Sequence, residues 1–121
     1  MVALREGPDG LTVEINGWER LGTLQRTFSI PWDHLDAAYA ISDLWPHVKG
    51  WRAPGLGIPH VILLGRMFYR DGRDFCSLYR AQPGVLLELR DEHYQRLLVS
   101  APDDVVQGII RRVTQGTDAA T

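Results

Sequence analysis

The side chains with the most potential for recognition chemistry lie between Trp45 and Pro59. This stretch combines aromatic rings with hydrogen-bond donors, and the residues concerned are Trp45, His47, Lys49, Trp51 and Arg52. Tryptophan and arginine are enriched among the few residues that carry most of the binding energy at interfaces. The sequence therefore predicts a recognition site here. The alternative, which is the commoner arrangement for so apolar a loop, is that both tryptophans fold inward and cap a barrel.

A second group of possible binding residues follows a few positions later. Arg66, Phe68 and Arg70 alternate along a predicted strand, so we expect them to share one of its faces. If that face points outward, it forms a basic strip with an aromatic centre. The alternative is cross-strand pairing of these arginines with Asp74, which would contribute only about a few tenths of a kcal/mol.

No residue pattern requires a particular reaction. The four histidines lack the i, i+2 or i, i+4 spacing of common metal sites. Asp33, His34 and Asp36 could form an acid–base pair, but such a cluster more often forms a turn. Cys76 is the single cysteine, and the sequence places no base beside it. We therefore expect a non-catalytic protein with no cofactor and no metal ion.

Size and charge restrict the class of protein further. The 121 residues suit one domain, and 13 basic against 15 acidic side chains give a net charge of −2. That balance argues against general nucleic-acid binding, which normally needs a basic excess. No apolar run approaches the roughly 18 residues of a membrane span, and residues 1–10 do not read as a signal peptide. A single cysteine fits a reducing compartment, so a cytoplasmic location is expected.

Alternating apolar residues predict seven strands, at 11–16, 21–30, 35–41, 61–70, 74–80, 85–90 and 95–100. The segment 35–41 is the least regular and could equally form a helical turn. Asn16-Gly17 and Asp71-Gly72 are strong hairpin-turn dipeptides. Three prolines and three glycines between Trp45 and Pro59 predict an irregular loop.

The last part of the chain predicts one amphipathic helix. Ser100 is suited to cap its N-terminus, Pro102 to its first turn and Gly116 to its end. The apolar residues share one side at helical spacing, and they are Val105, Val106, Ile109, Ile110 and Val113. Seven antiparallel strands with a terminal helix predict a mainly β fold, an open barrel capped by the helix's apolar stripe. This is the plan of pleckstrin-homology domains. The predicted core spans residues 11–114, with 1–10 and 115–121 as loose tails.

Three segments carry a resemblance to a known family. They run from Gly50 to Pro59, from Arg73 to Phe75, and from Tyr94 to Ser100 ahead of the helix. In these segments the chain resembles small bacterial pleckstrin-homology-like proteins, chiefly of actinobacterial type. The resemblance implies the barrel fold and a non-catalytic role, and it carries over no active-site residue. Inositol-lipid binding is disfavoured, because the expected first hairpin offers Arg20 beside Glu19 and no lysine.

Three hypotheses of function follow. The first is a module that binds a protein or peptide partner through the long loop, a barrel edge or a second copy of itself. The second is a small-ligand or enzymatic pocket at the barrel mouth. The third is a structural homo-oligomer, because open barrels expose edge strands.

Overall fold

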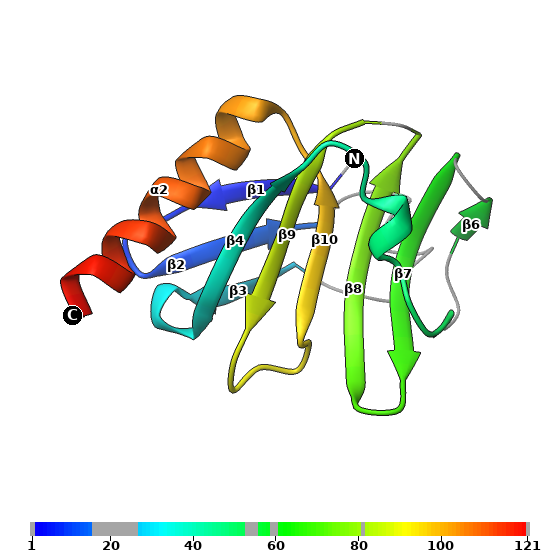
Figure 1. The fold of residues 1–121 in the computed structure, drawn as a ribbon, viewed down its shortest axis with the longest axis horizontal. Helices are drawn as coiled ribbons and strands as arrows, with labels where there is room; N and C mark the ends of the chain where they lie inside the picture. Colours follow the sequence, from blue (N-terminus) through cyan, green and yellow to red (C-terminus); the bar gives the residue numbers. More distant parts are fainter. Residues whose placement is uncertain (1, 16–26, 53–55, 59–60, 81, 121) are drawn as a thin grey trace.

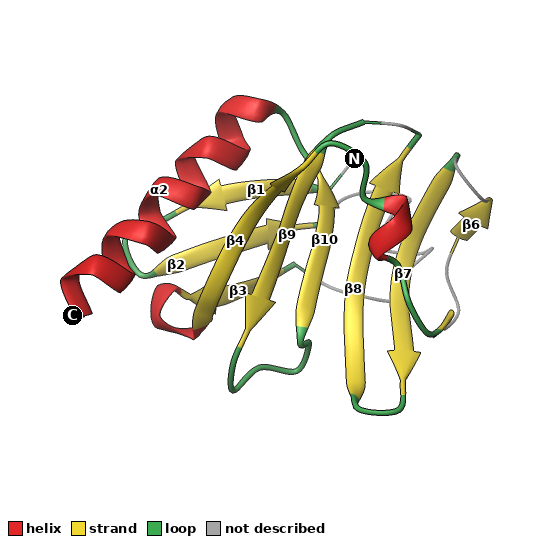
Figure 2. Ribbon diagram, viewed as in Figure 1, coloured by secondary structure: helices red, strands yellow, loops and turns green. Residues whose placement is uncertain are grey.

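The computed structural model describes residues 2–15, 27–52, 56–58, 61–80 and 82–120. Within these residues the chain is mainly β, with two sheets and one long C-terminal helix (Figures 1 and 2). Several sequence features lie outside the described residues: the turn Asn16-Gly17, the Glu19–Arg20 segment, the first part of the strand predicted at 21–30, and His60.

The smaller sheet contains three described strands in the order β1-β2-β3, all antiparallel. They are β1 (Ala3–Glu6), β2 (Gly10–Glu14) and β3 (Phe28–Pro31). The predicted alternation is confirmed, since Leu11, Val13 and Ile15 are fully buried. The prediction that residues 1–10 form a loose tail is wrong. Val2 and Leu4 are buried, and β1 pairs with β2. With four residues, two of them charged, β1 is too short for its alternating pattern to be recognised in the sequence.

The larger sheet contains the remaining described strands in the order β4-β9-β10-β8-β7-β5, with β6 beside β7. They are β4 (Leu35–Ile41), β5 (Trp51–Arg52), β6 (Leu56–Ile58), β7 (Ile62–Tyr69), β8 (Gly72–Tyr79), β9 (Gly84–Leu89) and β10 (Arg96–Ser100). The predicted segments from 35 to 100 are thus all strands. The β7–β8 reversal lies at Arg70-Asp71, one residue before the predicted dipeptide.

Strand β10 lies between β9 and β8 and runs parallel to β8, with Leu98 opposite Cys76 (Figure 1). The prediction of an entirely antiparallel sheet is therefore wrong. A turn signal fixes where the chain reverses but not which strand becomes the neighbour, and consecutive strands are neighbours only about two-thirds of the time. Among the described strands neither sheet closes on itself, so they form two open sheets instead of one seven-stranded barrel.

The helix α2 (Asp103–Ala120) covers the edges of both sheets (Figure 1). Its apolar stripe packs inward as predicted, with Val106, Ile109 and Val113 buried in the core between the sheets. On its other flank Gly108 lies against β1, where a Cβ atom would approach the Glu6 carboxylate to 2.6 Å. The predicted end at Gly116 is wrong, because a glycine within a helix costs only about 1 kcal/mol and does not have to end it.

The larger sheet has two unlike faces. Its inner face packs against the smaller sheet and α2, with Phe75, Leu87 and Val99 in that core. Its outer face carries a second, smaller apolar cluster formed by Leu44, Leu63, Met67, Cys76, Leu78, Leu86 and Leu98. Cys76 lies there as a small buried side chain, and burial raises the pKa of its thiol.

Candidate binding cleft on the outer face of the larger sheet

A buried ion pair lies on the outer face at the end of the sheet where β8 and β10 begin. Asp74 of β8 is only 1 % exposed, and the parallel register places it opposite Arg96 of β10. Arg96 donates to Asp74 Oδ2 from Nε at 2.9 Å and from Nη2 at 2.6 Å. Burial lowers the pKa of Arg96, but the hydrogen bond and charge of Asp74 raise it by more, so the guanidinium stays charged.

The tyrosine of the neighbouring strand completes the pair. The Tyr69 hydroxyl donates to Asp74 Oδ1 at 2.7 Å, so both carboxylate oxygens accept hydrogen bonds. Burial raises the pKa of Tyr69 to about 12, helped by the hydrogen bond to Asp74. At neutral pH the hydroxyl therefore stays protonated and remains a donor. A buried polar group satisfied in this way is stable, whereas a partly satisfied one is costly.

Further contacts fix the surroundings of Tyr69. Gln95 Oε1 lies 3.2 Å from the Tyr69 hydroxyl, and Gln95 Nε2 donates to the Asp71 carbonyl at 2.5 Å. The Gln95 amide can lie across the hairpin because Gly72 has no side chain, since a Cβ there would approach the amide to 2.3 Å. The Lys49 ammonium lies 4.1 Å from the centroid of the Tyr69 ring, a cation–π contact.

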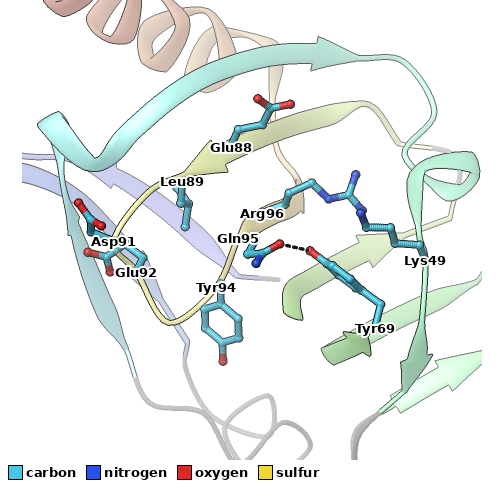
Figure 3. A pocket seen from close by; sticks show the side chains of 9 residues that line it. All are labelled: Lys49, Tyr69, Glu88, Leu89, Asp91, Glu92, Tyr94, Gln95 and Arg96. Carbon is cyan, nitrogen blue, oxygen red and sulfur yellow. Dashed lines mark hydrogen bonds between the residues drawn. The ribbon is translucent and has the colours of Figure 1, made fainter. Parts of the chain in front are cut away.

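These groups line one end of an open cleft of about 390 Å³. Its lining residues are Lys49, Tyr69, Glu88, Leu89, Asp91, Glu92, Tyr94, Gln95 and Arg96. Figure 3 shows Asp91 and Glu92 at one end and Lys49 and Arg96 at the other, with the hydrogen bond between Tyr69 and Gln95 drawn between them. The volume is in the range of ligand sites. Asp91 and Glu92 make one end acidic, and the positive charge of the other end comes from Lys49, because Arg96 is neutralised by Asp74.

The acidic end is held by the 3-10 turn Trp32–His34. His34 Nδ1 lies 2.5 Å from Glu92 Oε2, and the His34 carbonyl accepts from the Arg90 backbone N–H at 2.9 Å. The Arg90 side chain in turn donates to the Asp33 carbonyl at 2.7 Å. The hydrogen bond to Glu92 raises the pKa of His34 against the effect of burial. These contacts fix the β9–β10 loop, which forms one wall of the cleft.

The long loop contributes to this site in its first part. Trp45 is half-buried on the outer apolar cluster and donates from Nε1 to the Arg80 carbonyl at 2.6 Å. Trp45 therefore packs on the outer face of an open sheet and not at the mouth of a barrel. His47 is exposed, and its carbonyl accepts from Arg96 Nη2 at 2.9 Å. Lys49 lines the cleft.

Two other predicted site residues of this loop have no described side chain. The backbone of Trp51 and Arg52 forms β5, in which Trp51 pairs with Phe68. The side chains of both residues lie outside the described part of the structure. Whether they contribute to recognition stays a prediction.

The arginines of the predicted basic strip lie elsewhere. Arg66 is half-buried on the inner face with Phe68, and Arg70 is exposed in the hairpin turn beyond the end of β7. The strip therefore does not face outward. The alternative pairing with Asp74 is also wrong, because Asp74 points to the opposite face and binds Arg96.

Sequence reasoning missed the central residues of the cleft, Tyr69, Asp74, Gln95 and Arg96. A signal was available, because Asp74 is in phase with Cys76 and Leu78 on a strand whose other residues on that face are apolar. A carboxylate at such a position is buried and needs a cation. Its partner could not be named without knowing that β10 lies beside β8.

No protein-family model, no curated protein and no solved structure shows a significant match to this chain. Among the described residues, no helix is long and apolar enough to cross a bilayer. Within the same part of the chain, no three His, Cys, Asp or Glu side chains lie close enough together to hold a metal ion.

Proposed function

We propose that this protein is a non-catalytic binding module for a protein or peptide partner, and that the outer-face cleft is where the partner docks. The observation that carries the proposal is the separation of charge along the cleft (Figure 3). A segment with a basic residue near Asp91 and an acidic residue near Lys49 would match both ends. Such electrostatic complementarity sets orientation and specificity more than raw affinity.

The rigidity of the cleft supports this proposal. Asp74, Arg96 and Tyr69 already satisfy one another, so the floor needs no rearrangement when a partner arrives. A preorganised surface loses less conformational entropy on binding than a mobile one. The protonated Tyr69 hydroxyl and the paired Arg96 are suited to holding a partner and not to moving a proton.

The proposal includes the kinship with small bacterial pleckstrin-homology-like proteins and a cytoplasmic location. A mainly β chain with an inward-packed C-terminal helix supports that kinship. The parallel pairing of β8 with β10 departs from it. The kinship is therefore proposed at the level of layout and not of strand order.

The test is selection from a random displayed-peptide library on the immobilised protein. We expect the enriched peptides to combine basic and acidic residues, and Lys49→Glu to weaken their binding about tenfold. Glu88→Lys should weaken it as well. Arg111→Glu, a charge reversal on the exposed side of α2, is the matched control and should change nothing. Enrichment of no peptide, or equal binding to Lys49→Glu and the unmodified protein, would contradict the proposal.

Self-association is a second candidate function, favoured by one observation. Tyr39 is 47 % exposed on β4, which is an edge strand of the larger sheet. Because α2 covers the edge at β4, a second copy would dock on the exposed Tyr39 side chain and would not extend the sheet. Light scattering with Tyr39→Lys as the comparison tests it: a dimer that the substitution dissolves supports self-association, and a monomeric unmodified protein excludes it.

A further inference from the structure

Arg66 lies on the inner face of the larger sheet with one of its hydrogen-bond donors unsatisfied. It lies on β7 opposite Phe75, and its Nε is buried with no hydrogen-bond acceptor in the described part of the chain. None of the ion pairs found among the described residues includes it. A buried charged donor left without an acceptor is costly, so its persistence requires an explanation.

A second arginine lies beside it on the same face. The register pairs Arg66 with Phe75 and Phe68 with Arg73, so the two arginines are diagonal neighbours across β7 and β8. Arg73 Nη1 lies 3.0 Å from His93 Nε2, and its guanidinium is 5.7 Å from the Phe68 ring centroid. Arg73 also has no carboxylate partner within the described residues.

Among the described inner-face residues of β7, β8 and β10, there is no acid to balance the two arginines. The described inner-face positions of β7, β8 and β10 are all uncharged apart from the two arginines: Ile62, Leu64, Phe68, Phe75, Ser77, Tyr79, Leu97 and Val99. Both arginine charges also act on Tyr94, where burial raises the pKa and Arg66 and Arg73 lower it. The two cations and Tyr94 therefore share one region.

Aromatic rings line the same region. The Tyr94 ring centroid lies 5.6 Å from that of Phe28, 5.7 Å from that of Phe75 and 5.3 Å from that of His93. Phe75 and Tyr94 are buried in the core, so these rings form a packed apolar floor beneath the two positive charges. What remains unsatisfied above this floor is the positive charge, which the oxyanion of a small molecule would neutralise.

We infer that Arg66 and Arg73 form a second binding site, which takes the carboxylate or phosphate group of a small organic anion. Guanidinium groups bind such oxyanions through paired hydrogen bonds. Both arginines are half-buried, so a small molecule in solution fits better than an extended charged surface. Arg66 and Arg73 lie on the opposite face of the sheet from Lys49 and Arg96, and Tyr94 lies between the two sites. The arginine site binds a small anion and not a peptide, so it goes beyond the proposed function.

The test follows the arginine Nε–Hε NMR signals of the ¹⁵N-labelled protein during titration with benzoate and with inorganic phosphate at constant ionic strength. We expect a saturable shift of the Arg66 and Arg73 signals, and a melting temperature that rises with the anion concentration. A response to benzoate alone identifies a carboxylate ligand with an aromatic body, and a response to phosphate alone identifies a phosphate ligand.

Three methionine variants test which residues bind the anion. Arg66→Met and Arg73→Met should each weaken binding about tenfold or more, because each removes charged hydrogen-bond donors. Arg111→Met removes the same charge from the exposed side of α2 and should leave binding unchanged. Arg73→Met keeps the test decisive if Arg66→Met does not fold. No saturable shift with either anion, or equal weakening by Arg111→Met, would overturn the inference. Lys49→Glu separates this site from the outer cleft, since it should not affect the anion.

Discussion

Arg96 and Arg66 are both partly buried arginines of the same sheet. They differ in whether the fold supplies hydrogen-bond acceptors for the guanidinium group. Arg96 donates two hydrogen bonds to Asp74 and one to the His47 carbonyl. The buried Nε of Arg66 has no acceptor among the described residues. Within the described residues, the fold thus supplies acceptors for the Arg96 guanidinium but none for Arg66 Nε. The first charge is structural, and the second is available to a ligand.

Strand order produces this difference. The parallel register of β10 with β8 places Arg96 directly opposite Asp74. The antiparallel register of β7 with β8 places Phe75 opposite Arg66. Because side chains alternate between faces, Asp74 and Phe75 point to opposite sides of β8. Asp74 can therefore neutralise an arginine on the outer face only.

The largest effect is expected from Arg96→Met. It leaves the Asp74 carboxylate, which is 1 % exposed, without a cation in the interior. We expect the free energy of unfolding to fall by about 4 kcal/mol, because removing one member of a buried pair leaves an uncompensated charge. Urea unfolding followed by circular dichroism measures this. A loss below about 1 kcal/mol, the usual value of an exposed ion pair, would show that the pair behaves as a surface contact.

Asp74→Asn should have a smaller effect than Arg96→Met. The Arg96 side chain is 17 % exposed and can recover some hydration when its carboxylate is replaced by an amide. We expect a loss of about 2 kcal/mol, since the amide oxygen can still accept one hydrogen bond from Tyr69 or Arg96. The double variant Asp74→Asn/Arg96→Met should lose less than the sum of the two single losses. Strict additivity in urea unfolding would mean that the two residues are not coupled.

Arg66→Met should have the opposite sign. The substitution replaces a buried donor that has no acceptor with an apolar side chain of similar length. In buffer free of phosphate and organic acids, we expect the free energy of unfolding to rise by about 1 kcal/mol. A saturating anion should reverse the order, because only the arginine protein gains stability from binding. Thermal unfolding with and without benzoate measures both values, and destabilisation without the anion would show that Arg66 already has a stabilising role.

The sequence predicted which side chains of a strand are buried better than it predicted which strands lie beside each other. Leu11, Val13 and Ile15, and the stripe of Val106, Ile109 and Val113, are buried as their spacing indicates. Both patterns are local, because each depends on the geometry of one element. The neighbour of a strand is a long-range property, and nothing in residues 96–100 distinguishes a place beside β8 from a place at the end of a meander.

The same limit explains which site residues could be found. Lys49 was predicted from local composition and does line the cleft. A meander pairs β8 with β7 and β9, so the sequence offers Asp74 only Arg66 and Arg70 as partners. Its true partner, Arg96, is 22 residues away and meets it only through the parallel register. A buried acid in an apolar strand indicates that a cation lies beside it, but it does not indicate which residue supplies that cation.

The smallest expected effect concerns the acidic wall of the cleft. The hydrogen bond to Glu92 raises the pKa of His34 above its ordinary 6.5. A group whose pKa is higher in the folded state contributes stability that is fully present below about pH 6.5. That contribution disappears as the pH rises through the raised pKa, when His34 loses the proton that holds Glu92. Melting temperatures should therefore fall slightly between about pH 6 and pH 8.

His34→Gln should abolish that part of the pH dependence, because glutamine carries no titrating proton. His47→Gln is the matched control, since the His47 side chain is exposed and the contact to Arg96 uses only its backbone carbonyl. If His34→Gln keeps the slope of the unmodified protein, the wall is held by the backbone bond from Arg90 to His34 and not by charge. The acidic wall of the cleft would then keep its shape across this pH range.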